Sequence, residues 1–260
     1  MFFTGRTMMV SQYSMSESIK KLKACGFDGL EMSFLDREFR FRPDMTEPFF
    51  AEHTLQVAYE QNMPIYSTSL HGNYVYDDAK YEAIKKAIEA TPMYGTNLCI
   101  ISNAKKTYND QKDLNTLIER TRRLLEIAEK VNVTLAMEFE PGMICGTTAE
   151  LHRLFEEMDS DHLMANLDIG HVFLCDPDPM EAIRSLKGKI AHCHVENMLR
   201  GVHRHMVPYQ GDMDLKSYFE TLKEVGFDGA AGLDIYEGDY ESLGRLSVTY
   251  LKELSGRKDI

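Results

Sequence analysis

Several features that mark particular protein classes are missing from this sequence. There is no tryptophan, and the five cysteines are odd in number, widely spaced and without a Cys-x-x-Cys pair. Such spacing argues against a disulfide framework and is typical of reduced thiols in a cytoplasmic protein. The N-terminus, MFFTGRTMMV, lacks the basic segment and long apolar run of a signal peptide, and no apolar run approaches the length of a membrane span. We therefore predict a soluble cytoplasmic protein with no membrane partner.

Basic residues are also scarce. The chain has 29 Lys and Arg against 41 Asp and Glu, a formal net charge of −12. Nucleic acid binding depends on neutralising phosphates with basic side chains, and no basic arm is present to do so. This balance argues against a DNA or RNA partner and favours a small molecule as the substrate.

Short apolar runs alternate with helical periodicity along the whole chain. The clearest amphipathic helix is expected over Asp113–Val131, and Thr147 with Glu150 forms a capping box that begins the next helix. The expected strands are Phe2–Val10, Gly29–Phe34, Pro64–His71, Asn97–Ser102, Val133–Glu140, Leu163–His171, Ile190–Asn197 and Gly229–Tyr236. Eight strand–helix units in 260 residues are the number and size of a (β/α)₈ barrel. We predict an α/β fold, with a single TIM-barrel domain over residues 1–260.

Polar residues gather where these strands end, which is where the active sites of such barrels lie. Side chains at i and i+2 of a strand share one face, and a carboxylate inside an apolar strand is costly unless a cation or strong hydrogen bonds offset it. The titratable strand-end residues are His71, Glu138, Glu140, Asp168, His171, His192, His194, Asp234 and Glu237. A bound metal explains the recurrence of acids on neighbouring strands better than packing does.

Glu138, Asp168, His194 and Asp234 are the predicted metal ligands, because they recur at equivalent places. Three carboxylates and one imidazole suit one Mn²⁺, Mg²⁺ or Co²⁺ ion, with Zn²⁺ as an alternative. The further histidines His71, His171, His203 and His205 favour zinc and leave open a second metal site. His192 is expected to be buried beneath the site.

At these residues the chain resembles the xylose isomerase-like TIM-barrel superfamily of sugar phosphate isomerases and epimerases, which also includes endonuclease IV. AMEFEPG is similar to the family's strand-5 motif, whose first glutamate binds metal, which implies Glu138 rather than Glu140. LDIGH resembles its Asp-x-x-His motif, with Asp168 as ligand and His171 as a substrate- or metal-binding residue. HCHVENMLR resembles the ketose 3-epimerase segment, which implies that His194 binds metal and Arg200 contacts substrate.

The chain departs from the family pattern at two places. The family's last ligand is a glutamate, whereas GLDIY supplies Asp234, whose carboxylate sits roughly 1.5 Å further back unless Glu237 replaces it. His203, His205 and His71 resemble zinc ligands of endonuclease IV, but Asn103 stands where that enzyme has another histidine. We therefore favour His71, His203 and His205 as substrate-pocket residues over a second metal centre.

The leading hypothesis is a metal-dependent carbohydrate isomerase or epimerase that works through an enediolate of a sugar, keto-sugar or cyclitol. Glu138 would remove the proton next to the carbonyl, and Asp234 would return one from the other face. His171 and Arg200 would hold the substrate. The resemblance also allows a homo-oligomer, because members often form dimers or tetramers.

Three alternatives stay open. The same intermediate could expel a leaving group, which would make the protein a lyase or dehydratase of keto-sugars. A multinuclear zinc centre would instead indicate a phosphodiester hydrolase of the endonuclease IV type. The third is a non-catalytic binding protein, which would bind metal but show no proton exchange with any sugar.

Overall fold

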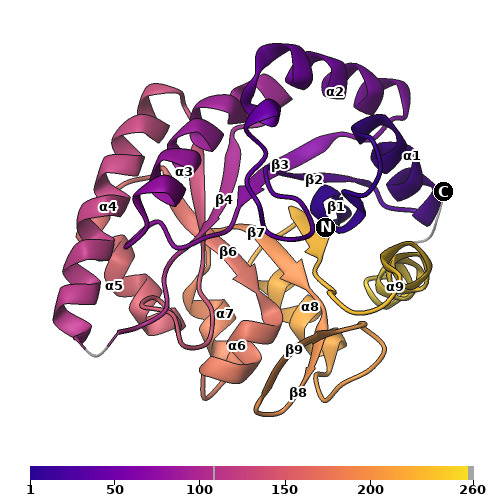
Figure 1. Ribbon diagram of the computed structural model, residues 1–260. Helices are drawn as coiled ribbons and strands as arrows, with labels where there is room; N and C mark the ends of the chain where they lie inside the picture. Colours follow the sequence, from indigo (N-terminus) through magenta and orange to yellow (C-terminus); the bar gives the residue numbers. More distant parts are fainter. Residues whose placement is uncertain (108, 257–260) are drawn as a thin grey trace.

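Eight parallel strands close into a barrel, surrounded by helices, in this computed structural model (Figure 1). The structure describes residues 1–107 and 109–256. The strands neighbour one another in the order β1, β10, β7, β6, β5, β4, β3, β2. Their bounds are β1 Phe2–Arg6, β2 Gly29–Ser33, β3 Ile65–Leu70, β4 Leu98–Ser102, β5 Thr134–Glu138, β6 Leu163–Asp168, β7 Ile190–Val195 and β10 Ala230–Leu233. This confirms the predicted single TIM barrel.

The outer layer follows the barrel order, with at least one α-helix after each barrel strand. The α-helices are α1 Met15–Cys25, α2 Pro48–Glu60, α3 Asp78–Ala90, α4 Asp110–Lys130, α5 Thr148–Met158, α6 Ile169–Cys175, α7 Pro179–Ser185, α8 Leu215–Glu224 and α9 Tyr240–Leu254. Short 3₁₀ helices are η1 Thr7–Val10, η2 Pro43–Thr46 and η3 Thr91–Tyr94. The expected capping box of α5 is present, with Thr147 accepting from the backbone of Glu150.

All eight predicted strands were longer than the observed ones, and in two of them the extra residues form helical turns. The first strand ends at Arg6, and Thr7–Val10 turns into η1. The sixth ends at Asp168, whose side chain accepts a hydrogen bond from the backbone N–H of His171 and so caps α6. An apolar run cannot distinguish a buried strand from a buried helical turn, because both hide the same side chains.

A two-stranded antiparallel hairpin interrupts the alternation after β7. It consists of β8 (Asn197–Leu199) and β9 (Val202–Met206), and it extends beyond the barrel wall beside α6 in Figure 1. No strand was predicted between Asn197 and Gly229, whereas the structure places His203 and His205 on β9. This hairpin brings both histidines next to α6, where His171 lies.

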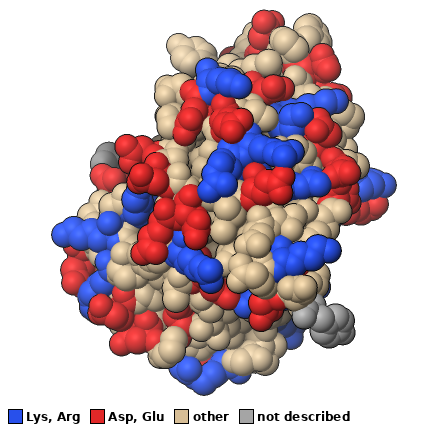
Figure 2. Space-filling view, turned by 90° about the vertical axis from the view of Figure 1, so that its left-hand side faces the viewer, with Lys and Arg blue, Asp and Glu red and all other residues tan. Residues whose placement is uncertain are grey.

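The surface carries charges of both signs. Figure 2 shows Lys and Arg side chains interspersed with Asp and Glu over one face, which therefore presents no continuous basic area. Among the described residues, no helix combines the length and apolar character that crossing a membrane requires. All five cysteines are free thiols, and the cytoplasmic location expected from them stays a prediction.

Candidate metal and active site

The four predicted metal ligands converge at the carboxyl ends of neighbouring barrel strands. Glu138 ends β5, Asp168 ends β6, His194 lies near the end of β7, and Asp234 directly follows β10. All four are buried, with at most 5% of each exposed. His194 Nδ1 lies 2.8 Å from Glu138 Oε2 and 3.7 Å from Asp234 Oδ2. Parallel strands explain this arrangement, because their carboxyl ends meet at one mouth of the barrel.

Asp168 belongs to the same cluster from the other side. In one group of possible ligands, an Asp168 oxygen lies within 4.8 Å of ligand atoms of Glu138 and His171. In another, an Asp168 oxygen lies within 4.8 Å of ligand atoms of Glu196, His205 and Asp234. The two groups of residues share Asp168. The structure therefore places Asp168 where it can bridge Glu138 to Asp234.

Glu31 fixes the orientation of the His194 ring. His194 Nε2 lies 2.9 Å from Glu31 Oε2, so that nitrogen is engaged and Nδ1 faces Glu138 and Asp234. Metal-binding histidines commonly donate their other ring N–H to a carboxylate, which orients the ring and sets the tautomer. Nδ1 is thus the atom of His194 available to a metal ion. Glu31 was not among the predicted site residues. It is nevertheless a carboxylate inside an apolar strand, GLEMS, which is the same pattern that indicated the other acids.

Asn166 supports the same pair from β6. Its amide donates to Glu138 Oε2 at 2.5 Å, and its carbonyl oxygen lies 2.8 Å from His192 Nδ1. His192 is fully buried, as predicted for a residue beneath the site, and burial lowers its pKa to about 3. Asn166 therefore joins the residue beneath the site to the predicted catalytic glutamate.

The donor set fits a divalent cation. Asp168 Oδ2 and Glu196 Oε2 are buried polar atoms without a hydrogen-bond partner among the described residues. Unpaired buried carboxylate oxygens are costly in the absence of a compensating charge. The residues that could hold the ion are Glu138, Asp168, His194 and Asp234. Mostly oxygen donors with one imidazole nitrogen suit Mn²⁺, Mg²⁺, Co²⁺ or Zn²⁺.

Neighbouring charges decide the protonation of the cluster. Burial by itself would raise the pKa of Glu138, but the adjacent His194 and His71 hold that pKa well below its usual value. Burial would lower the pKa of His194, yet Glu31 and Glu138 raise it to about 9. Burial together with the adjacent Asp168 raises the pKa of Glu196 well above normal. Metal-free protein therefore holds a charged imidazole between two carboxylates.

Arg6 is a second residue that the sequence analysis missed. Its side chain is buried at the end of β1, where Nη1 donates to Asp234 Oδ1 and, at 3.1 Å, to the hydroxyl of Tyr236. Nε donates to Glu31 Oε1 at 2.9 Å, and Nη2 lies 3.0 Å from His71 Nε2. One oxygen of Asp234 is thus ion-paired, and the other faces His194 and His205.

The structure decides which acid of the eighth strand lies at the site. Glu237, the alternative to Asp234, is exposed and forms an ion pair with Arg204 on β9. Asp234 is 1% exposed and lies within the cluster. The geometry therefore retains Asp234, with its shorter side chain, as the candidate.

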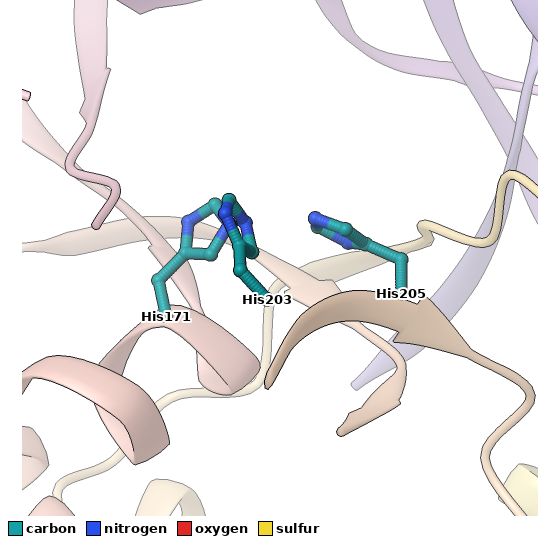
Figure 3. Close-up of side chains that lie close together, drawn as sticks. All are labelled: His171, His203 and His205. Atoms are coloured by element: carbon teal, nitrogen blue, oxygen red, sulfur yellow. The ribbon is translucent and has the colours of Figure 1, made fainter. Parts of the chain in front are cut away.

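His171, His203 and His205 form a second group beside the first (Figure 3). His171 Nδ1 lies 3.0 Å from the carbonyl oxygen of Phe139, which can only accept, so Nδ1 donates to it. His171 Nε2 lies 3.0 Å from His203 Nε2, and His205 Nδ1 lies 3.4 Å from Asp234 Oδ2. The three imidazoles thus lie together where α6 and β9 meet. His71, which follows β3, lies 3.9 Å from Glu138 Oε1.

Arg200 is not brought into either group. Its guanidinium carbon lies 4.8 Å from the centre of the Phe173 ring, and its backbone N–H donates to Asp212. The side chain is exposed at the end of the hairpin. Its role in substrate binding stays a prediction.

Comparisons with known proteins agree with this fold. A model of the xylose isomerase-like TIM barrel family matches residues 19–254. The chain belongs to this family. An inosose dehydratase of Lacticaseibacillus casei is 29% identical over 124 residues, which are 41% of this chain and 42% of the relative. The chain therefore matches less than half the length of that curated relative.

Two further proteins extend the similarity to nearly the whole chain. The L-ribulose-5-phosphate 3-epimerase UlaE of Salmonella paratyphi A is 23% identical over 237 residues, covering 87% of this chain and 84% of that protein. The crystal structure of the IOLI protein with a bound zinc atom superposes with a TM-score of 0.80 at 16% identity, covering 98% of each chain. At this identity the structural likeness establishes the fold alone.

Proposed function

We propose that this protein is a divalent-metal-dependent isomerase or epimerase that moves a proton at the carbon beside a carbonyl of a sugar or cyclitol. The observation that carries the proposal is His194, held by Glu31 through Nε2 and directed through Nδ1 at Glu138 and Asp234. The family relationship, the epimerase and dehydratase relatives, and the zinc bound by a structural neighbour support it.

The residues divide the work by position. When bound, the metal would withdraw electron density from the carbonyl oxygen and so acidify the adjacent C–H bond. Glu138 takes the proton, because the adjacent His194 and His71 hold its pKa low and keep it an unprotonated carboxylate in the cluster. Asp234, which follows β10, faces the same His194 nitrogen and returns a proton to the other face. His171, His203 and His205 donate or accept hydrogen bonds at the substrate hydroxyls.

A dehydratase is the second candidate, and the Arg6–Asp234 ion pair specifically favours it. A carboxylate paired with a buried arginine is a poor proton donor, which would leave Glu138 as the single base. Glu138, protonated when it takes the hydrogen from carbon, would then pass that proton to the departing hydroxyl, so that water is lost. Loss of water gives an unsaturated ketone that absorbs in the ultraviolet, whereas epimerisation leaves the mass and saturation of the substrate unchanged.

The deciding experiment incubates the metal-loaded protein with keto-sugars and keto-cyclitols in deuterated water. We expect deuterium to enter the carbon next to the carbonyl, detected by NMR, and this exchange to fall at least 1000-fold in Glu138→Gln, an order-of-magnitude loss for a removed base. Glu140→Gln, two residues further along the same segment, is the matched variant and should retain exchange. Loss of exchange in Glu140→Gln alone would show that the base is assigned to the wrong glutamate.

The number of metal ions per chain distinguishes the proposed isomerase or epimerase from the phosphodiester hydrolase. About one ion per chain, measured by plasma mass spectrometry on protein purified without added metal, supports the isomerase or epimerase. Two or three zinc ions would make His71, His171, His203 and His205 ligands and favour the phosphodiester hydrolase.

A further inference from the structure

The loop between β2 and η2 holds an aromatic side chain in a backbone conformation that bulky residues avoid. Phe39 has φ of +58°. The other described non-glycine residues with positive φ are Asn62, Asn132 and Asp159, which belong to the types enriched in this region. Such a conformation in a phenylalanine persists only where the surroundings enforce it, and it is found disproportionately at ligand-binding sites.

The loop enforces this conformation through its own hydrogen bonds. The backbone N–H of Asp36 donates to the carbonyl of Arg40 at 3.0 Å, and the N–H of Phe39 donates to the carbonyl of Asp36 at 2.9 Å. The Asp36 carboxylate accepts from the backbone of Glu38 and from Arg40 Nε at 2.8 Å. The N–H of Arg37 donates to Ser11 Oγ and so ties the loop to the barrel. Phe39 is therefore fixed before any ligand arrives.

The Phe39 ring continues an aromatic wall that begins at the metal-ligand cluster. His205, 3.4 Å from Asp234, packs perpendicular to Tyr236 with ring centres 5.1 Å apart. Tyr236 in turn stacks on Phe39 at 5.9 Å with an angle of 28° between the rings. Although it contacts Tyr236, Phe39 remains 52% exposed. Phe39 thus presents an apolar ring to solvent, one ring further from the metal-ligand cluster than Tyr236.

We propose that Phe39 and Tyr236 form an outer subsite for a second ring of the substrate. The substrate would be a glycoside, with its reacting sugar at the Glu138–His194 cluster and its aglycone, a sugar or aryl ring, stacked on Phe39. This proposal rests on the proposed function. A free monosaccharide at the cluster would be covered by His205 and Tyr236 and would leave Phe39 unused. Stacking on an aromatic face adds affinity beyond simple burial and fixes orientation.

The test compares two probes that differ only in the second ring, methyl β-D-glucopyranoside and phenyl β-D-glucopyranoside. Their dissociation constants are measured by titration calorimetry on the full-length, metal-loaded protein. We expect the phenyl glycoside to bind about tenfold more tightly, which corresponds to about 1.4 kcal/mol and lies at the upper end of a stacking contact. Phe39→Ala should reduce this ratio to about one, and Phe39→Leu should keep part of it. Phe49→Ala, which removes an 83% exposed phenylalanine on α2, should leave the ratio unchanged.

Three results would overturn the subsite: equal affinity of the wild-type protein for both probes, an unchanged ratio in Phe39→Ala, or no binding of either glycoside. Failure of the proposed function has a different signature. It would appear as an absence of deuterium exchange in every keto-sugar and keto-cyclitol, whatever the ratio of the two dissociation constants.

Discussion

Arg6 controls how much negative charge the centre of the barrel can hold. Among the described residues it is the only buried Lys or Arg, and it contacts Glu31, Asp234 and His71 at once. Because Glu31 also contacts His194, a single arginine positions acids on two opposite sides of the cluster. Arg6 therefore influences the orientation of His194, the predicted metal-binding histidine, indirectly through Glu31.

Replacing Glu31 with Gln tests this positioning role. The amide keeps the size of the side chain but removes the charge that holds His194 Nε2–H, so Nδ1 becomes less basic and the ring less ordered. We expect metal affinity, measured by competition with a chromophoric chelator, to fall about 10- to 100-fold. Glu237→Gln, at an exposed position paired with Arg204, should leave the affinity unchanged. Equal metal affinities of the wild type and Glu31→Gln would show that Glu31 does not support the metal site.

Gly232 on β10 is required because no side chain fits between Glu31 and His194. A Cβ atom at this position would lie 2.7 Å from Glu31 Oε2 and 3.2 Å from His194 Cδ2. Gly232→Ala should therefore displace one of them and weaken metal binding about tenfold or more, an order-of-magnitude estimate for a disturbed supporting residue.

Gly244→Ala on α9 is the matched control for this substitution. Its added Cβ would meet Phe27 at an ordinary 3.4 Å, and alanine favours a helix over glycine by about 1 kcal/mol. Chemical denaturation should show this variant to be as stable as wild type or more so, with metal affinity retained. A Gly232→Ala protein with full metal affinity would contradict the close-contact argument.

At the scale of elements, the β8–β9 hairpin carries His203 and His205, and it brings them against His171 on α6. The side chain of Asn197 donates to the carbonyls of Pro208 and Met213 and accepts from the backbone of Met198 and Met213. This buried amide ties the start of β8 to the segment that follows β9. The position of His203 and His205 depends on this attachment, since β9 pairs with β8 and with no barrel strand.

Asn197→Ala should loosen the hairpin more than the barrel. Each buried backbone group left unpaired costs about 1–3 kcal/mol, so we expect faster amide hydrogen exchange over residues 198–213. Exchange in β3 and β4, three or four strands from β7 in the barrel order, should stay slow. Uniformly faster exchange throughout the barrel would mean that Asn197 stabilises the whole fold rather than the hairpin.

At the scale of the whole molecule, buried histidines make the metal-free fold sensitive to acid. Burial lowers the pKa of His71 to about 4 and those of His192 and His205 to about 3. Each titrates near 6.5 in the unfolded chain, so below that pH the unfolded state binds more protons than the folded state. The free energy of unfolding should then fall by up to about 1.4 kcal/mol per pH unit for each of them.

His194 acts in the opposite direction. Its folded pKa of about 9 favours the folded state below pH 6.5, and this contribution is lost as the pH rises through 9. Urea denaturation of the chelator-treated protein from pH 4.5 to 9 should show greatest stability near neutrality, with the steeper decline on the acid side. A stability that stays level from pH 7 to pH 5 would contradict the burial of these three imidazoles in neutral form.

The barrel and the predicted ligands could be read from the sequence because their signals are local. Glu138, Asp168, His194 and Asp234 each interrupt or end an apolar strand, and eight such strands alternate with helices. Strand ends were less certain, as at Thr7 and Ile169, because a buried turn and a buried strand hide the same residues. The hairpin was not predicted, because its strands are short and β9 is largely exposed and polar.

The sequence by itself thus determined the fold class and the strand ends at which Glu138, Asp168 and His194 lie. Only the tertiary structure decided how the residues of the site are held. Arg6 and Asp234 are 228 residues apart, Glu31 and His194 are 163 apart, and Phe39 meets Tyr236 across the mouth. Such pairs leave no periodic pattern in the chain. They arise because closing the barrel sets its first two strands beside or across from its last two, where a charge or a ring finds a partner that no neighbouring residue provides.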